Sequence, residues 1–130
     1  MTTKSSTFRP EIGQTLFIGF MAEKPFAVTV TGFHHDPRFS SEQIEFTVCS
    51  NGKKDSTSLS FYTFFPDAPL DSKFVFCVML ECEGDYYEDK YFFEPQSAFD
   101  HMDALASGAI KPRVDFSCND RAFHVQVEKV

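Results

Sequence analysis

The chain has 130 residues, with 12 basic and 19 acidic side chains and a formal net charge of −7 at pH 7. Binding to a phosphate backbone needs a basic surface, so this balance argues against nucleic acid as a partner. No stretch approaches the roughly 18 consecutive apolar residues of a membrane span, and the polar start MTTKSSTFRPE does not resemble a secretory signal. We therefore expect a cytoplasmic protein with one domain.

Aromatic residues give the apolar content its character, since there are 17 Phe and 4 Tyr but no Trp. Aromatic and β-branched residues favour strands over helices. Short segments of alternating apolar and polar residues recur along the chain, and polar turns separate them. The segments predicted to be strands are 15–21, 26–33, 44–49, 59–65, 73–81, 86–93, 114–118 and 122–130.

This pattern predicts an all-β fold, an antiparallel sandwich or barrel, and of these we expect a two-sheet antiparallel β-sandwich. Residues 1–12 are expected to form an extended segment ahead of a single domain at 13–130. The short break before residue 26 predicts a hairpin, residues 50–58 read as a turn-rich loop, and residues 73–81, apolar on both faces, as a central strand. The residues expected in the core are Phe20, Val28, Phe46, Phe61, Phe76, Phe116 and Val125.

One segment, SAFDHMDALASG, has the spacing of a helix instead. Phe99, Met102 and Leu105 recur at helical intervals, Ser97 is a suitable N-cap, and Gly108 is a suitable stop. The sequence therefore predicts a short helix near 97–107.

The four cysteines, at positions 49, 77, 82 and 118, show no CxxC or CxxxH spacing. Three of them lie inside apolar segments, and disulfides are expected mainly in secreted proteins. We therefore predict four reduced thiols, with neither a disulfide nor a zinc site. No cofactor or metal is expected.

A compact polar cluster follows the second predicted strand. His34, Asp36 and Arg38 lie within five residues, and Pro37 stiffens the backbone that carries them. Together they offer hydrogen-bond donors and acceptors that suit the hydroxyl groups of a sugar ring. The alternative is a polar turn that only reverses the chain.

Motifs in several segments resemble those of the galectins. The family's sugar motif H-x-N-P-R-F is similar to HHDPRF at His34–Phe39, although Asp36 stands where the family has Asn. The other matching segments are GQTL at Gly13–Leu16, Phe26–Val30, VCSNG at Val48–Gly52, Phe64–Phe65, FDH at Phe99–His101, and the final VDFSCND…FHVQV.

This resemblance implies a two-sheet β-sandwich of the galectin or jelly-roll type. It also implies a non-enzymatic lectin that binds β-galactosides on one concave face. His34, Asp36 and Arg38 would hold the galactose hydroxyls, and Asn51 is a looser match for a later asparagine of the family. Because the chain has no Trp to stack on the sugar, Tyr62 or another aromatic residue would have to replace it. The expected partner is a galactose-containing glycan; the resemblance also allows a homodimer and secretion without a signal.

Two alternatives remain open from the sequence. In a second motif register, Ile44–Asn51 matches the sugar-motif strand, HHDPRF belongs to an inserted loop, and no sugar ligand is retained. The chain would then be a sugar-independent protein-interaction domain. A lipid-binding β-barrel is a third reading, based on the size of the chain and its many Phe residues.

Two further groups of residues carry side chains that can form sites. The acidic residues between positions 81 and 89 lack an EF-hand spacing, which favours a solvated turn over a calcium site. His101 lies beside Asp100 and Asp103, but no nucleophile motif accompanies them. We therefore expect a helix surface there and do not expect an enzyme.

Overall fold

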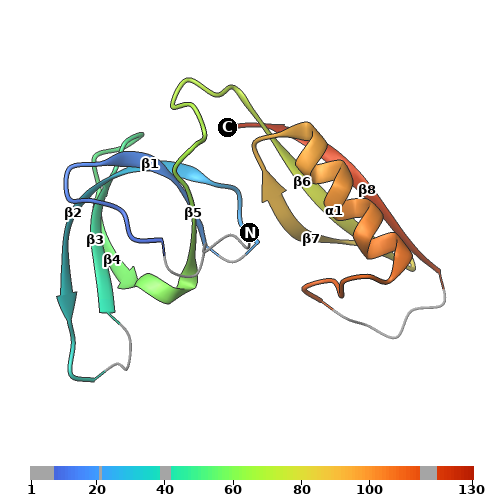
Figure 1. Cartoon of the computed structure of the whole chain (residues 1–130), viewed down its shortest axis with the longest axis horizontal. Coiled ribbons are helices and arrows are strands. Elements are labelled where there is room, and N and C mark those ends of the chain that lie inside the picture. The colour runs from blue at the N-terminus through green and yellow to red at the C-terminus, as the bar shows by residue number, and fades with distance from the viewer. Residues whose placement is uncertain (1–7, 21, 39–41, 115–119) are drawn as a thin grey trace. The chain divides into compact units, whose positions relative to one another are not determined.

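The computed structural model describes residues 8–20, 22–38, 42–114 and 120–130 (Figure 1). These residues form two compact units. Unit 1 contains the described residues of 8–20 and 25–71, and unit 2 contains residues 22–24 and the described residues from 72 to 130. Each unit has one antiparallel sheet.

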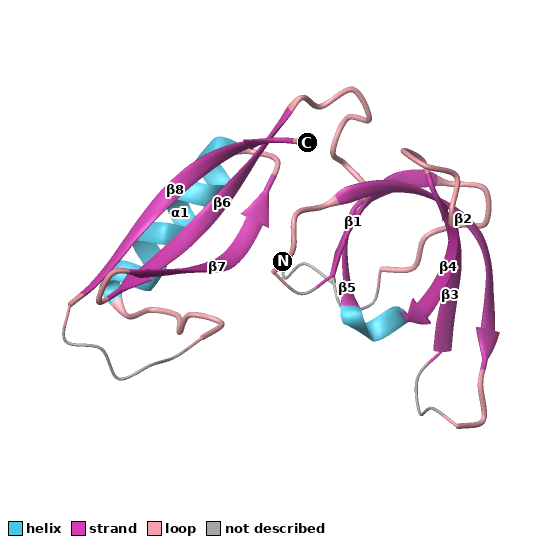
Figure 2. Cartoon of the chain, turned by 180° about the vertical axis from the view of Figure 1, so that it is seen from behind, coloured by secondary structure: helices cyan, strands magenta, loops and turns pink. Residues whose placement is uncertain are grey.

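The sheet of unit 1 has five strands in the order β4-β3-β2-β1-β5, and it curls around its own interior (Figure 2). A short 3₁₀ helix, η2, separates β4 from β5. The elements are β1 Thr15–Phe20, β2 Phe26–His35, β3 Glu42–Val48, β4 Lys54–Ser58, η2 Leu59–Phe61 and β5 Tyr62–Phe65.

Alternation along the strands builds the core of unit 1. The predicted hairpin is confirmed, with Leu16 of β1 opposite Val28 of β2. Burial of each large apolar side chain contributes about 1.5–3 kcal/mol. The central cluster, in which every side chain is at most 1% exposed, consists of Leu16, Ile18, Val28, Val30, Ile44 and Phe46.

The segment before β1 packs against this core. Phe8 packs its ring 5.6 Å from that of Phe64, and the Arg9 guanidinium lies 3.9 Å from the centre of the Phe33 ring. Arg9 also forms a two-pronged ion pair with Glu42. Residues 8–11 have no regular secondary structure, as expected for an extended segment.

The sheet of unit 2 has three strands in the order β7-β6-β8, and helix α1 lies across one face of it (Figure 1). Val78 of β6 packs there against Ala98 and Leu105 of α1. The predicted central strand is confirmed as β6. The elements are β6 Phe74–Cys82, β7 Asp85–Phe92, α1 Pro95–Ser107 and β8 Arg121–Lys129.

The predicted fold class is confirmed: the chain is mostly β, with two antiparallel sheets and one short helix. The helix begins at Pro95 with Glu94 as its N-cap, so the predicted cap at Ser97 is wrong. Proline is favoured in the first turn because its fixed φ suits the helix. The predicted stop is confirmed, because Gly108 has the left-handed φ of 82° and its N–H donates to Leu105.

Two other predictions fail around β4. The loop expected at 50–58 contains this strand, whose polar residues give no apolar alternation but pair along β3. Phe61, expected in the core, is 58% exposed. Residues 59–61 form η2 instead of a strand, so the alternation that would have buried Phe61 does not hold there.

The other core predictions have mixed outcomes. Val28 and Phe46 are buried, and Phe20, Phe76 and Val125 are half-buried. Phe116 and nearly all of the strand predicted at 114–118 lie outside the described residues.

The prediction of four reduced thiols is wrong, because Cys82 is disulfide-bonded. Cys49 is a free, exposed thiol and Cys77 a free, buried one; Cys118 lies outside the described residues. Cys82 ends β6, opposite Arg121 of β8. The residues that lie near Cys82 are set by the pairing of β6 with β8. The spacing of the cysteines in the sequence does not reveal that pairing.

Candidate functional site

Within the predicted polar cluster, Asp36 and Arg38 form hydrogen bonds with each other. The Asp36 carboxylate accepts hydrogen bonds from the Arg38 backbone N–H at 3.0 Å and from its guanidinium Nε and Nη2 at 3.2 and 2.8 Å. These side-chain and backbone bonds lower the pKa of Asp36. The Arg38 side chain is 81% exposed and that of Asp36 is 18% exposed, so a solvated arginine covers a half-buried aspartate in the turn after β2.

His34, by contrast, pairs with a residue of the neighbouring strand. Its Nδ1 lies 2.5 Å from Oε2 of Glu45 on β3, and the two side chains are 42% and 45% exposed. His34 stands opposite Gln43 in the β2–β3 register. Glu45 is two residues further along on the same face, a diagonal neighbour within reach of a long side chain.

A β-bulge turns His34 toward this face. The register passes from Val30 opposite Phe46 to Gly32 opposite Glu45, so Thr31 is an extra residue. The bulge shifts the alternation by one position. Simple alternation from Val30 would send His34 into the core, but the bulge instead leaves it on the outer face.

Small residues flank Glu45 on both sides. Gly32 of β2 and Ser56 of β4 stand opposite it in the two registers. A Cβ at Gly32 would lie 3.6 Å from Glu45 Oε1, so glycine keeps this carboxylate accessible. Here the surface forms an open hollow of about 400 Å³, lined by Thr31, Glu45, Phe46, Lys54, Asp55 and Ser56.

The structure does not bring Asn51 and Tyr62 to this hollow. Asn51 lies in the turn between β3 and β4, where its side-chain oxygen accepts a hydrogen bond from the Lys53 N–H at 2.9 Å. That turn is at the far end of β3 from His34, about 16 Å away at 3.3 Å per residue. Tyr62 packs against the core cluster, with its ring 6.0 Å from that of Phe46.

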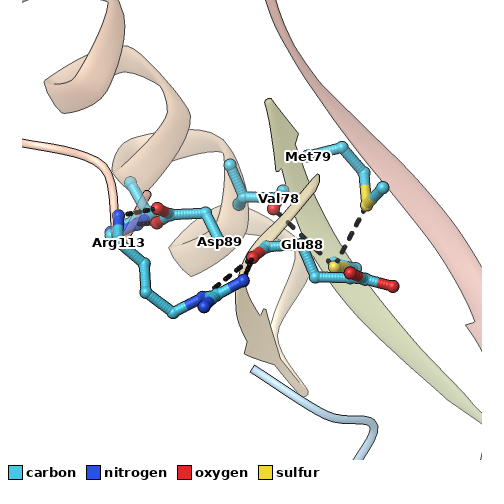
Figure 3. A network of polar contacts seen from close by, with 7 residues as sticks. Val78, Met79, Glu88, Asp89 and Arg113 are labelled. Carbon is cyan, nitrogen blue, oxygen red and sulfur yellow. Dashed lines mark hydrogen bonds and ion pairs between the residues drawn. The ribbon is translucent and has the colours of Figure 1, made fainter. Parts of the chain in front are cut away.

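A second imidazole–carboxylate pair lies in unit 2. His101 of α1 is next to Asp100 and Asp103 in the sequence, but its Nε2 lies 2.6 Å from Oδ2 of Asp89 on β7. These two side chains are only 16% and 5% exposed. The other Asp89 oxygen accepts the Arg113 backbone N–H at 2.5 Å (Figure 3). Asp89 therefore ties together the helix, the sheet and the segment that follows the helix.

No motif in the sequence points directly to Glu45 or Asp89 as partners of these imidazoles. Glu45 is a polar position on a strand that alternates, and such positions are ordinarily solvent-facing. Asp89 is the extra residue at a register shift between β7 and β6. Both partnerships depend on bulges, and an aspartate or glycine inside a strand is only a weak hint of one.

Neither a metal centre nor a membrane helix is found in the part of the chain that the structure describes. No group of three or more His, Cys, Asp or Glu side chains there is placed to hold a metal ion. The acidic residues considered for calcium surround the β6–β7 hairpin, whose turn residues Glu83 and Gly84 have φ values of 54° and 90°. No described helix is long and apolar enough to cross a membrane.

Comparisons of the chain with family models, with curated proteins and with solved structures found no match. The case for a function therefore rests on the residues and their geometry. Within unit 1 these converge on the outer face of β2, β3 and β4, around His34 and Glu45.

Proposed function

We propose that the chain is a non-enzymatic carbohydrate-binding module of galectin-like type, which binds a galactose-containing glycan in the hollow of unit 1. The single observation that carries the proposal is the exposed His34–Glu45 pair beside that hollow. Flanking small residues leave the carboxylate open to a ligand.

The lining groups match the chemistry of sugar hydroxyls. Glu45 accepts hydrogen bonds, Lys54 donates them, and the hydroxyls of Thr31 and Ser56 do both. Among the described residues, Glu45 Oε1 has no hydrogen-bond partner, so it can accept one from a ligand. A hydrogen bond to a charged group contributes about 1.5–3 kcal/mol and a neutral one about 0.5–1.5 kcal/mol.

Of the residues that the galectin resemblance implies, His34 remains at the proposed site, and Glu45 takes the place of Asp36 and Arg38. Asp36 and Arg38 are occupied with each other, whereas Glu45 both pairs with His34 and lines the hollow. The sugar is therefore expected to contact β3 and β4 more than the turn after β2.

Affinity is expected to be low. Phe46, the one aromatic among the described residues that line the hollow, is 1% exposed and offers no face for stacking. Losing an aromatic contact removes about 0.5–1.5 kcal/mol. With a few exposed hydrogen bonds remaining, we expect a Kd of about 1 mM, or about −4 kcal/mol.

The test is a titration of the ¹⁵N-labelled protein with lactose, followed by amide chemical shifts, with a methyl mannoside as the control sugar. Lactose should shift the amides of Gly32, Glu45 and Ser56. Glu45→Gln keeps the shape of the side chain but removes its charge. We expect it to weaken binding about tenfold, since tenfold corresponds to about 1.4 kcal/mol.

Two further variants locate the sugar. Asn51→Ala, at the other end of β3, should bind lactose as the wild type does. Arg38→Ala separates the hollow from the turn: unchanged binding favours the hollow, and lost binding places the sugar on the predicted turn. The absence of shifts with any sugar would retire the proposal and favour the protein-interaction alternative.

The disulfide at Cys82 bears on where such binding would occur. Disulfides persist mainly in oxidising compartments, and the cytosol keeps thiols reduced. We therefore propose that the glycan is met in an oxidising compartment rather than in the cytoplasm, the location predicted from the sequence.

A further inference from the structure

The face of the unit 2 sheet that turns away from α1 carries two sulfur atoms in contact. Phe76 and Val78 of β6 pack on the helix side, so the alternate residues Cys77 and Met79 lie on the other face. The Cys77 thiol donates to the Met79 Sδ at 3.4 Å, and Figure 3 draws this contact as the dashed line at the Met79 sulfur. Cys77 is 0% exposed and Met79 is 7% exposed, so both side chains are shielded from water.

An imidazole shares this face with the two sulfurs. His124 of β8 stands directly opposite Met79 in the β6–β8 register, and the Cβ atoms of such a pair lie about 4.5–5.5 Å apart. The His124 ring stands edge-on to that of Tyr86, with centroids 5.8 Å apart. In the part of the chain that the structure describes, neither nitrogen of this ring has a hydrogen-bond partner. The imidazole can therefore bind a ligand beside Met79.

A thiolate, a thioether and an imidazole together form the ligand set of a soft metal ion. Among the described residues, Cys77 and His124 do not form a group of three with another His, Cys, Asp or Glu side chain, so the thioether of Met79 is what completes the set. Zinc takes its protein ligands from Cys, His, Asp and Glu. Thiolate and thioether sulfurs select Cu(I).

We propose that unit 2 binds one Cu(I) ion between the sulfurs of Cys77 and Met79, with His124 as the third ligand. Binding forms a bond from copper to Cys77 Sγ and breaks the S–H bond, and the proton leaves to solvent. No electron is transferred. The ion takes the place of a proton that the Cys77 thiol already directs toward the Met79 sulfur.

The spacing of the two sulfurs is close to what such a site needs. Metal–sulfur bonds are about 2.3 Å long, so two sulfurs on a three- or four-coordinate ion lie about 3.8–4.0 Å apart. The contact between Cys77 and Met79 is slightly shorter than this, at 3.4 Å. Methionine has three rotatable side-chain bonds, so its sulfur can move without displacing the strand. His124 is half-buried and can take up an ion from solvent.

Burial favours a monovalent ion over a divalent one, because an uncompensated charge is costly away from water. Cu(I) and the Cys77 thiolate cancel, so the bound pair is neutral, whereas Zn²⁺ would leave one positive charge. The carboxylates of Glu88 and Glu128 lie on the same face. Glu88 is exposed to solvent, however, and Glu128 already accepts the Tyr91 hydroxyl at 3.0 Å. The site is therefore expected to select Cu(I) over Zn²⁺.

Competition for Cu(I) against the coloured chelator bicinchoninate tests the site. Ascorbate keeps the copper reduced without reducing disulfides, and a Cys49→Ser background removes the exposed free thiol. We expect the protein to withdraw one Cu(I) per chain and to bind no Zn²⁺ at the same concentrations. Cys77→Ser should abolish the binding. A protein that withdraws no copper, that binds Zn²⁺ equally well, or that keeps its copper after Cys77→Ser would overturn the proposal.

A matched pair of methionine variants separates ligation from packing, since exchange of Met for Leu conserves volume. Loss of a contact behind a metal ligand already costs about 10–100-fold in affinity, so Met79→Leu, which removes a ligand, should weaken Cu(I) binding at least about tenfold. Met102→Leu, on the helix side of the same sheet, should leave the affinity unchanged.

His124→Phe keeps an aromatic ring but removes both nitrogens, and it should also weaken Cu(I) binding at least about tenfold. A circular dichroism spectrum of each variant without copper checks that it is folded. Unchanged affinity in Met79→Leu or in His124→Phe, or an equal loss in both methionine variants, would overturn the proposed ligand set. The result is independent of the lactose titration, since no residue of the hollow is involved.

Discussion

The two units each contain an imidazole–carboxylate pair, and the contrast between these pairs separates a candidate binding group from a structural one. The contact distances are nearly the same, 2.5 Å for His34–Glu45 and 2.6 Å for His101–Asp89. Glu45 is 45% exposed beside a hollow, and its second oxygen has no partner among the described residues. Asp89 is 5% exposed, and its second oxygen already accepts the Arg113 N–H.

Burial decides what each pair contributes. An exposed ion pair is screened by water and contributes about 0–1 kcal/mol to stability. Removing one partner of a buried pair leaves the other group without hydration, which costs far more. A ligand can use the carboxylate of the first pair, whereas the second holds the fold together.

The largest effect is expected for Asp89→Ala. The substitution removes the acceptor of both the His101 imidazole and the Arg113 N–H in a buried position. We expect the free energy of unfolding to fall by about 2–4 kcal/mol. Urea unfolding measures the total, and amide hydrogen exchange in α1 and β7 assigns the loss to unit 2.

Glu45→Ala is the matched control for that measurement. It removes the carboxylate of the exposed pair and should lower the free energy of unfolding by less than about 1 kcal/mol. If the two variants lost similar stability, burial would not be what distinguishes the two pairs.

The free thiols also differ in burial between the two units, and we expect an effect of intermediate size on their labelling rates. Cys49 of unit 1 is exposed, whereas burial raises the pKa of Cys77 in unit 2 to about 12. The thiolate is the reactive form. At about pH 8 we expect iodoacetamide to label Cys77 at least about a hundredfold more slowly than Cys49, as read by peptide mass spectrometry.

Denaturation provides the internal control, because both thiols should then react at similar rates. Cys82 should stay unlabelled in denaturant until a reductant is added, since it is disulfide-bonded. Rapid labelling of Cys77 in the native protein would contradict the buried, protonated state.

The smallest effect is expected for the Asp36–Arg38 pair. Its hydrogen bonds from Arg38 lower the Asp36 pKa, so Arg38→Ala should return that pKa toward its ordinary value of about 3.9. Because the folded pKa is depressed, the stabilisation is complete above the unfolded pKa and is lost as pH falls through the folded one. Carboxyl ¹³C shifts recorded against pH measure this directly. An Asp36 that titrates alike in both proteins would show that Arg38 does not hold it in solution.

Sequence alone determined most of the strands, because their alternation reflects which side chains leave water. The segments containing β1, β2, β3 and β6 carry apolar residues at every second position or on both faces, and each lies close to its predicted range. The Gly108 stop was equally visible, since glycine takes up a positive φ without strain. Strand β4 shows no apolar alternation. It is a strand because it pairs with β3, and its own polar residues do not indicate that pairing.

The candidate site was visible only in part. His34 belonged to a local polar cluster that the sequence displayed, but its partner Glu45 lies 11 residues away and meets it through a bulge at Thr31. His101 was likewise visible, whereas Asp89, 12 residues away, became its partner through another register shift. Alternation is a local property that a sequence shows directly. Register and bulges arise only when strands pair, so the tertiary structure alone decided which of these side chains meet.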